Sequence, residues 1–426
     1  MQTERGGATI GGVPATELAN AYGTPLLALD TDVLDARVAT FASAGERFGI
    51  DVCYAAKALL FVELARRLAR SPLGIDVCSL GELLTAERAG VSARRLVLHG
   101  CGKTEAELRA AADGRVGRVV VDHRAELERL GEIARPDAPV RVLLRVNTGI
   151  EAHTHAYVRT GGEDSKFGFP IDDLDEAIAA ARAHPNLRLI GAHSHLGSQL
   201  FEPEPYAASV EILLDAYARM LAAGAPASEI IVGGGFGVDG GSGVEPLDLE
   251  ATLATIVAAV AAGSRARSVP APRVGIEPGR GIVAEAGTSL YRVVAVKRQG
   301  SRRFAIVDGG IADNPRPALY GAYHHPFLAG RGSTAALGEF TICGRSCEND
   351  RLVVAPLPAD LAAGDLLGLA TTGAYTYSMA SNYNRFPKPA VVFAGAGRHR
   401  LVVRRERDDE LLRNDVDDAR PSTSSG

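Results

Sequence analysis

Lys57 lies in the stretch CYAAKALL, near the end of an apolar run that starts after Asp51 and predicts a buried strand. A charged ammonium is costly to desolvate at such a place. Two interpretations are open. The side chain extends to water from the strand mouth, or it is partly desolvated, so that its neutral amine can form a Schiff base with a carbonyl compound. Residues elsewhere in the chain must decide between them.

Other residues able to do chemistry also stand where predicted strands end. Each has an ordinary explanation, since a glycine triplet is often a turn, a histidine at a strand end is often structural, and a carboxylate near an arginine could be a plain salt bridge. Their shared position is the informative feature. The candidates are Lys57, Asp76, Ser79, His193, His195, Ser198, Gly233, Gly234, Gly235, Glu277, Gly279 and Arg280.

Together these residue types suit one kind of cofactor. Three consecutive glycines let backbone N–H groups approach a phosphate, and a nearby arginine adds positive charge. A lysine that forms an imine, a carboxylate that keeps a ring nitrogen protonated and a histidine that stacks on a ring are the protein groups that pyridoxal phosphate requires. We therefore predict pyridoxal 5'-phosphate as the cofactor and Lys57 as its Schiff base lysine.

Parallel strands alternating with helices must position these residues. Eight such units between about residues 50 and 285 fit a closed (β/α)8 barrel of the TIM type better than an open sheet, although the count leaves a doubly wound fold open. The carboxyl ends of barrel strands form one mouth, where the candidates would meet. The strand candidates are DVCYAAK, GIDVCS, RLVLHG, RVVVD, VRVLLRVN, LIGAHSHLG, IIVGGGF and RVGIEPGR.

After Ala286 the sequence changes to strand-like runs broken by glycine, without comparable helical periodicity. This predicts a separate β domain, to which the amino-terminal segment adds the strand TPLLALD. The tail from Asp408 is charged and then small and polar, so we expect it to fray. The predicted domains are a cofactor-binding barrel at 31–285, a β domain at 286–407 together with 1–30, and a flexible tail at 408–426.

The composition is that of an ordinary soluble protein. The 426 residues are 46% hydrophobic and 23% charged with a net charge of -5, and no basic face is indicated, which argues against nucleic acid as a partner. Without a run of membrane-spanning length or a signal-peptide pattern, we expect a cytoplasmic protein without a membrane partner. The five cysteines show no CxxC pair, which favours reduced thiols over disulfides or zinc.

The sequence resembles the diaminopimelate decarboxylases, within the alanine racemase-like, ornithine decarboxylase-related group of pyridoxal phosphate enzymes (fold type III). The resemblance implies a barrel with a C-terminal β domain, and a homodimer with active sites at the subunit interface. The matching stretches span almost the whole chain and are YAAKA, IDVCSLGEL, RVNTGIEAHTHAYVRTGGEDSKFG, GAHSHLGSQ, GGGFG, EPGR, NPRPALYGAYHH, CGRSCEND and GAYTYSMASNYN.

The resemblance also implies residue roles. Lys57 resembles the Schiff base lysine, His195 the residue stacked on the cofactor ring, and Cys347 the proton donor that reaches in from the partner subunit. Glu277 resembles the carboxylate that faces the pyridine nitrogen. The candidate cofactor contacts are Lys57, Asp76, His195, Ser198, Gly233, Gly234, Gly235, Glu277, Gly279, Arg280 and Tyr375, and the candidate substrate contacts are Arg280, Arg316, Tyr320, Glu348 and Tyr375.

The reaction implied by the resemblance is decarboxylation of meso-diaminopimelate to L-lysine. The substrate amine would displace Lys57, carbon dioxide would leave as electrons flow into the cofactor ring, and a general acid, for which Cys347 is the candidate, would protonate the carbanion. Racemases of this fold usually place an arginine opposite the ring nitrogen, so Glu277 favours decarboxylation.

Departures from the family pattern lie where the substrate would be read. Asn349, Asp350 and Arg351 replace the usual serine, glycine and aspartate, and an arginine beside Glu348 could neutralise it. Two alternatives stay open: a decarboxylase of another amino acid or amino-acid conjugate in a specialised pathway, and a cofactor-binding protein without turnover. The HTH sequence at 153–155 could be a metal pair, but no third ligand of suitable spacing accompanies it, so no metal is predicted.

Overall fold

The computed structural model describes residues 3–4, 7–150 and 165–416, and the chain divides into two compact units. The barrel unit comprises Thr31–Gly287 and Thr371–Ser378. The β unit comprises Met1–Asp30, Thr288–Ala370 and Met379–Gly426. The sequence predicts residues 371–378 in the β domain, but they lie with the barrel unit, because they hydrogen-bond to its backbone.

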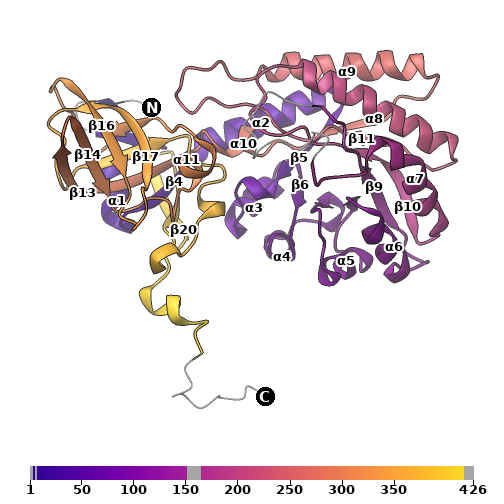
Figure 1. Ribbon diagram of the computed structural model, residues 1–426, viewed down its shortest axis with the longest axis horizontal. Coiled ribbons are helices and arrows are strands. Elements are labelled where there is room, and N and C mark those ends of the chain that lie inside the picture. The colour runs from indigo at the N-terminus through magenta and orange to yellow at the C-terminus, as the bar shows by residue number, and fades with distance from the viewer. Residues whose placement is uncertain (1–2, 5–6, 151–164, 417–426) are drawn as a thin grey trace. The chain divides into compact units, whose positions relative to one another are not determined.

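Eight parallel strands close into a barrel in the order β10-β11-β12-β5-β6-β7-β8-β9, which confirms all eight predicted strands and the barrel fold. Figure 1 shows helices α4 to α9 arranged around these strands. The strands are β5 Ile50–Ala55, β6 Gly74–Val77, β7 Leu96–Leu98, β8 Arg118–Val121, β9 Val140–Arg145, β10 Leu187–His193, β11 Glu229–Ile231 and β12 Arg273–Ile276. The helices are α2 Thr31–Phe48, α3 Val62–Ala69, α4 Leu80–Arg88, α5 Glu105–Ala112, α6 Arg124–Ile133, α7 Leu174–Ala183, α8 Glu204–Ala222, α9 Leu249–Ala266 and α10 Arg280–Val283.

Side chains that alternate along the strands fill the barrel in layers. The middle layer is apolar and consists of Cys53, Val97, Val120, Leu143, Ile190 and Ile231. The next layer toward the carboxyl ends is polar and buried, and it includes Asp76, His99, Asp122, Arg145, His193 and Glu277. The layer at the amino ends is charged and includes Asp51, Arg95, Arg118, Arg141, Glu229 and Arg273.

Helix α9 is long and apolar enough, at 18 residues and a mean hydropathy of 1.2, to cross a membrane by length and composition alone. No run of membrane-spanning length was expected from the sequence. In the structure this helix is part of the barrel's outer ring and packs against α8 and α2. Its buried residues, among them Leu253, Ile256 and Val260, recur at helical spacing, as expected for a helix with one face on a protein core.

The β unit is built on a sheet with the order β17-β16-β14-β13-β4-β19-β20, and β18 joins it through β13. The predicted amino-terminal strand is confirmed, since β4 pairs in parallel with β19. Its elements are β1 Thr3–Glu4, β2 Gly7–Ile10, β3 Val13–Pro14, α1 Ala15–Tyr22, β4 Leu26–Asp30, β13 Gly287–Gln299, β14 Arg302–Val307, α11 Arg316–Tyr320, β15 Pro326–Leu328, β16 Leu337–Cys343, β17 Arg351–Pro358, β18 Leu366–Ala370, β19 Ala390–Gly395 and β20 Arg398–Val403.

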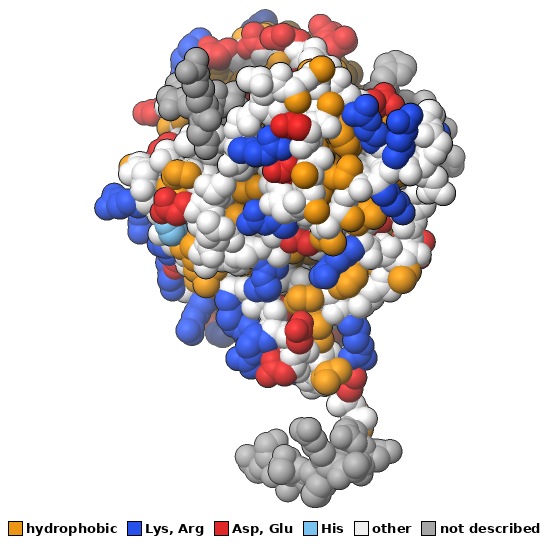
Figure 2. Space-filling view, turned by 90° about the vertical axis from the view of Figure 1, so that its left-hand side faces the viewer, with side chains coloured by type: hydrophobic (Ala, Val, Ile, Leu, Met, Phe, Trp, Pro, Cys, Tyr) orange, Lys and Arg blue, Asp and Glu red, His pale blue; other side chains and the backbone are white. Residues whose placement is uncertain are grey.

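The predicted flexible tail does not begin at residue 408. Asp408–Leu412 forms a 3-10 helix in which Glu410 pairs with Arg404, and residues 417–426 lie outside the described part of the chain. Figure 2 shows one face of the molecule, on which hydrophobic, basic and acidic side chains are interspersed. Scattered exposed apolar side chains of this kind are ordinary for a protein surface.

Candidate functional site

Lys57 follows strand β5 in a 3-10 turn (Ala56–Ala58) instead of standing in the strand. The first N–H of this turn donates to Asp76 Oδ1 at 3.2 Å, which fixes the turn against strand β6. The Lys57 side chain reaches solvent. Desolvation acts to lower its pKa, but attraction to neighbouring groups, Tyr375 foremost, outweighs this effect and the pKa is raised. The partial desolvation expected from the sequence is thus present, and the surrounding groups oppose its effect on the pKa.

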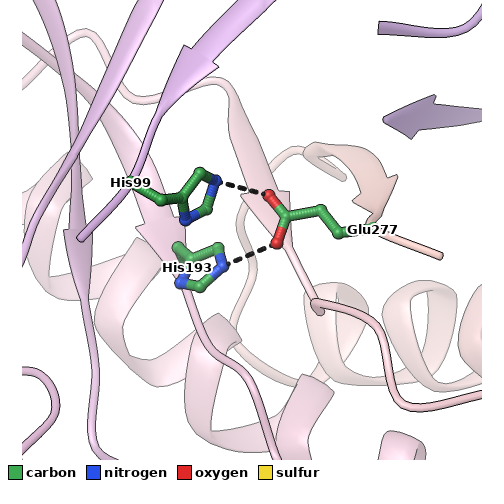
Figure 3. A group of neighbouring side chains, drawn as sticks. All are labelled: His99, His193 and Glu277. Carbon is green, nitrogen blue, oxygen red and sulfur yellow. Dashed lines mark hydrogen bonds and ion pairs between the residues drawn. The ribbon is translucent and has the colours of Figure 1, made fainter. Parts of the chain in front are cut away.

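Each carboxylate oxygen of Glu277 faces one histidine at the end of the barrel strands (Figure 3). His99 Nε2 lies 2.9 Å from Oε1, and His193 Nε2 lies 3.0 Å from Oε2. Desolvation would raise the pKa of Glu277, but the two imidazoles hold it well below its usual range. Burial lowers the pKa of His99 to about 4. Glu277 is thus an ionised carboxylate that is hydrogen-bonded to His193 at Oε2 and lies within ion-pair distance of His99 at Oε1. Burial and the charge of Glu277 raise the pKa of the neighbouring Asp76.

The same three side chains also have the spacing of a metal site. The ligand atoms of His99, His193 and Glu277 lie within 4.8 Å of one another, and all three residues are buried. However, His193 Nε2 and Glu277 Oε2 are already hydrogen-bonded to each other, which occupies two of the atoms that a cation would need. We interpret the cluster as support for an ionised carboxylate and assign no metal to it.

The loop Gly233–Gly235 after strand β11 orients His195. Gly234 N–H donates to His195 Nδ1 at 3.1 Å, which places the ring proton on Nε2, and burial lowers the pKa of this histidine well below its usual value. The first and third glycines have φ of 85° and 104°. A Cβ on Gly234 would come within 2.2 Å of the Glu277 carbonyl oxygen, and one on Gly279 within 3.0 Å of two alanine Cβ atoms. Packing therefore requires glycine here, and a phosphate cradle requires the same lack of side chains.

Arg280 and Tyr375 add a cation and an aromatic ring to this end of the barrel. Arg280 Nη2 donates to Ser198 Oγ at 3.1 Å, and its guanidinium lies 4.9 Å from the centre of the Tyr375 ring. Tyr375 has a φ of 59°, and its N–H donates to the Ala58 carbonyl oxygen at 2.8 Å. Since Ala58 belongs to the turn that carries Lys57, these contacts gather the predicted cofactor residues of the barrel unit into one site.

In the β unit, Cys347 and Glu348 lie in the loop between β16 and β17, and both are exposed. Asn384 Oδ1 accepts the Cys347 N–H at 3.1 Å, and the Tyr383 hydroxyl donates to Glu348 Oε1 at 2.5 Å. Tyr383 and Asn384 therefore hold Glu348 and Cys347, two consecutive residues of this loop, in place.

The unusual sequence after Glu348 also has a structural role. Asp350 accepts hydrogen bonds from the Ile311 N–H at 2.7 Å and from Ser346 Oγ at 2.8 Å, which closes the loop on its own base. Arg351 is the first residue of strand β17. Within the described ranges no ion pair joins Arg351 to Glu348, whose partner is the tyrosine hydroxyl.

Three of the predicted substrate residues, Arg316, Tyr320 and Glu348, belong to the β unit, and the other two, Arg280 and Tyr375, belong to the barrel unit. Arg316 is buried on helix α11, with its guanidinium 5.1 Å from the centre of the Tyr320 ring. Cys347 and Glu348 lie in the same unit, whereas the predicted cofactor residues lie in the barrel unit. The HTH sequence at 153–155 lies outside the described residues.

Sequence reasoning missed His99, Tyr383 and Asn384. Strict alternation along strand β7 from Val97 would have placed His99 on the inward face of the barrel, so its signal was present. Tyr383 contacts a residue 35 positions away, which no local pattern indicates. Ser79, by contrast, is a helix cap that accepts the Glu82 N–H, so the structural explanation holds for this candidate.

These groups fit pyridoxal phosphate. The barrel offers an accessible lysine, an ionised buried carboxylate, a neutral oriented imidazole and a glycine loop beside an arginine, which are the groups that this cofactor requires. A family model described as "Pyridoxal-dependent decarboxylase, pyridoxal binding domain" matches residues 34–284. The class defined by fold and site is therefore the barrel-type pyridoxal-dependent decarboxylases, and the cofactor is pyridoxal phosphate.

Known proteins narrow this class. A diaminopimelate decarboxylase of Actinosynnema pretiosum subsp. auranticum is 43% identical, over 97% of this chain and 93% of the relative. The crystal structure of diaminopimelate decarboxylase from M. jannaschii in co-complex with L-lysine superposes with a TM-score of 0.90 at 28% identity, covering 97% of both chains. The Helicobacter pylori enzyme complexed with L-lysine gives 0.86 at 30% identity, over 93% and 98% of the two chains. The chain belongs to the diaminopimelate decarboxylase family.

Proposed function

We propose that this chain decarboxylates meso-diaminopimelate to L-lysine. Relatives named for this reaction cover nearly the whole chain, and two solved relatives are complexed with L-lysine. The cofactor, when bound, supplies the electron sink that accepts the electron pair left as carbon dioxide departs. The protein must hold the cofactor, keep its ring nitrogen protonated, bind the substrate and return a proton.

The observation that carries the proposal is the ionised state of Glu277. Its two oxygens are held by His99 and His193, and the pKa of the carboxyl lies well below its usual range. A carboxylate that stays ionised can keep a pyridine nitrogen protonated, which makes the stronger electron sink. An arginine, which racemases of this fold usually place opposite the ring nitrogen, could not accept a hydrogen bond from a protonated ring nitrogen. The carboxylate therefore supports decarboxylation over racemisation.

Other barrel residues position the cofactor and the reacting amine. Lys57 is the proposed attachment residue, and its solvent-accessible side chain leaves room for an incoming amine. His195 is neutral and fixed by Gly234, so its ring can stack without adding charge. Arg280 lies between Ser198 and Tyr375, where it can neutralise a phosphate or a carboxylate.

Cys347 is the proposed general acid. The residues proposed to bind the distal end of the substrate are Glu348, Arg316 and Tyr320. Diaminopimelate carries an amine and a carboxylate at that end. Arg316 with Tyr320 can bind the carboxylate, and Glu348 can accept from the ammonium through charge-assisted hydrogen bonds. The hydrogen-bond partner of Glu348 is the neutral hydroxyl of Tyr383, which orients the carboxylate for this task.

We further propose a cytoplasmic homodimer with shared active sites, acting on a small-molecule substrate without nucleic acid or membrane partners. Cys347 and Glu348 are exposed in the single chain, although a proton donor and a substrate-reading carboxylate need a site from which water is excluded. A second subunit that covers this loop accounts for both observations.

A panel of substrates tests the proposal. Carbon dioxide release is measured from meso-diaminopimelate, lysine, ornithine, arginine and glutamate with the purified holoenzyme. We expect turnover of diaminopimelate and rates lower by roughly 10⁴-fold for analogues that leave a buried polar partner unpaired. Glu348→Gln should lose most of this activity, while Glu339→Gln, an exposed residue of strand β16, should not. Turnover of another amino acid with none of diaminopimelate would refute the substrate and leave the decarboxylase chemistry intact.

A further inference from the structure

The charged layer at the amino ends of the barrel strands borders a cavity of about 230 Å³. The apolar middle layer lies between this layer and the polar layer of the cofactor site. Asp51 is the acid of the charged layer that lines the cavity, and Glu277 also contributes to the lining. The lining arginines are Arg94, Arg95, Arg118, Arg141 and Arg273.

Among these arginines, Arg95 has a structural role. Its Nε donates to the Leu73 carbonyl oxygen at 3.0 Å and its Nη1 to the Ala69 carbonyl oxygen at 2.8 Å. Both carbonyls lie in the connection that leads from helix α3 into strand β6, so Arg95 fixes that connection. The other four guanidinium groups remain to be explained.

One buried carboxylate serves three of them. Arg118 and Arg273 reach Glu229 Oε2 at 2.8 and 2.9 Å, and Arg141 stands 3.7 Å from Oε1. Asp51 adds a loose contact of 3.9 Å to Arg273. The fourth, Arg94, is exposed and makes no ion pair within the described part of the chain.

The charges around the cavity therefore do not balance. Five guanidinium groups face two carboxylates of this layer, Asp51 and Glu229, and Glu277 raises the number of carboxylates to three at most. Burial lowers the pKa of Arg141, attraction to Glu229 opposes this effect, and repulsion from the neighbouring guanidinium groups adds to it. A network that served stability alone would gain by matching its charges, because unpaired like charges in a partly buried place are costly.

We propose that this cavity is a binding site for a small multivalent oxyanion, of the phosphate or polycarboxylate kind. Guanidinium forks bind two oxygens of such a group at once, and several forks around one cavity favour an anion with more than one charge. The cavity has room for a group of this size. The side chains of Arg141 and Arg273 are 44% and 58% exposed, so an anion can reach them from solvent.

Calorimetric titration of the holoenzyme tests the proposal, since bound cofactor already fills its own phosphate site. Inorganic phosphate and citrate are titrated separately at constant ionic strength, with chloride as the reference salt. We expect saturable binding with one site per chain for at least one anion. Phosphate alone would identify a phosphoryl group, citrate alone a polycarboxylate, and both the shared oxyanion chemistry.

Three single variants make the test specific. Arg141→Gln and Arg273→Gln should each weaken binding about tenfold or more, which is the effect of one lost charge-assisted contact. Arg109→Gln, an exposed arginine of helix α5, should leave binding unchanged. Decarboxylase activity of all three should stay near wild type, which confirms folding. The proposal is overturned if neither anion binds saturably, or if the three variants and the wild type bind alike.

Discussion

At the scale of single residues, the ionisation of Glu277 depends on the two rings that face it. His99→Leu removes one of the two imidazoles that lie against this carboxylate. The pKa of Glu277 should then rise, because the remaining imidazole opposes desolvation alone. A protonated carboxyl cannot keep the cofactor nitrogen protonated, so kcat should fall when Glu277 takes up a proton. In the wild type this fall should occur at a pH below the ordinary pKa range of carboxyl groups. In His99→Leu it should move to higher pH.

The pH profile of kcat measures this shift, with KM for the substrate expected to stay within about twofold. His99→Gln, whose side-chain amide can still donate, should recover part of the wild-type profile. His123→Asn is the matched control, because it replaces an exposed histidine with another residue that caps helices well. A His99→Leu profile that superimposes on the wild type would show that His99 has no influence on Glu277.

A second prediction at this scale concerns Glu348, which is proposed to bind the distal end of the substrate. Tyr383→Phe removes the hydroxyl that holds Glu348, so the carboxylate should lose its fixed orientation. Because a loosely held carboxylate binds the substrate ammonium less well, KM for diaminopimelate should rise roughly 10-fold with kcat much less affected. Steady-state kinetics measures the split. Tyr22→Phe, which removes a hydroxyl bonded to His399 at 2.7 Å, is the control, and equal kinetics for both variants would show that Tyr383 does not hold Glu348 in place.

The identity of the site residues could be predicted from the sequence better than their chemical state. Lys57 was identified from its place at a strand end, but the direction of its pKa shift could not be predicted. The pKa depends on Asp76 and on Tyr375, which is distant in the chain, and such charges cannot be summed before the fold brings them together. His99 was missed because its strand was located but its inward face was not followed to the last residue.

At the scale of elements, Lys103 connects three parts of the barrel. Its Nζ donates to the Gly100 and Val120 carbonyl oxygens and to Glu126 Oε1, at 2.8, 2.6 and 2.8 Å, so all three protons are used. Both charged side chains are 1% exposed. Lys103→Met should lower the free energy of unfolding by about 3–5 kcal/mol, because Glu126 is left as a buried carboxylate without its cation.

Urea unfolding of the holoenzyme measures the loss. The double variant Lys103→Met/Glu126→Gln should be more stable than Lys103→Met alone, since it removes the uncompensated charge. Arg124→Gln is the control: it breaks an exposed pair with Glu128 on helix α6 and should leave stability nearly unchanged. Equal losses for Lys103→Met and Arg124→Gln would contradict a special role for the buried pair.

The elements themselves were the most predictable part of the molecule. Alternation and helical spacing located all eight barrel strands, because each strand is a short apolar run between helices of clear period. Residues 371–378 were placed wrongly. Their first residues continue the strand-like run DLLGLATTGAY, and the hydrogen bond that holds Tyr375 to the barrel joins it to a turn more than 300 residues earlier in the chain.

At the scale of the whole molecule, the proposed dimer predicts complementation between inactive chains. Lys57→Ala removes the proposed attachment residue, which lies in the barrel unit, and Cys347→Ala removes the proposed acid, which lies in the β unit. Each homodimer should be nearly inactive. If each site takes its acid from the partner, a mixed dimer contains one site with both wild-type residues and one with neither.

The two variants, carrying different affinity tags, are mixed, allowed to exchange subunits and purified through both tags. Carbon dioxide release from the mixed dimer should recover to about half of the wild-type value per dimer, because one of the two sites is intact. Mixing Lys57→Ala with Lys57→Arg is the control and should recover nothing, since neither chain supplies the lysine. A mixed Lys57→Ala and Cys347→Ala dimer without activity would mean that each site is built from one chain.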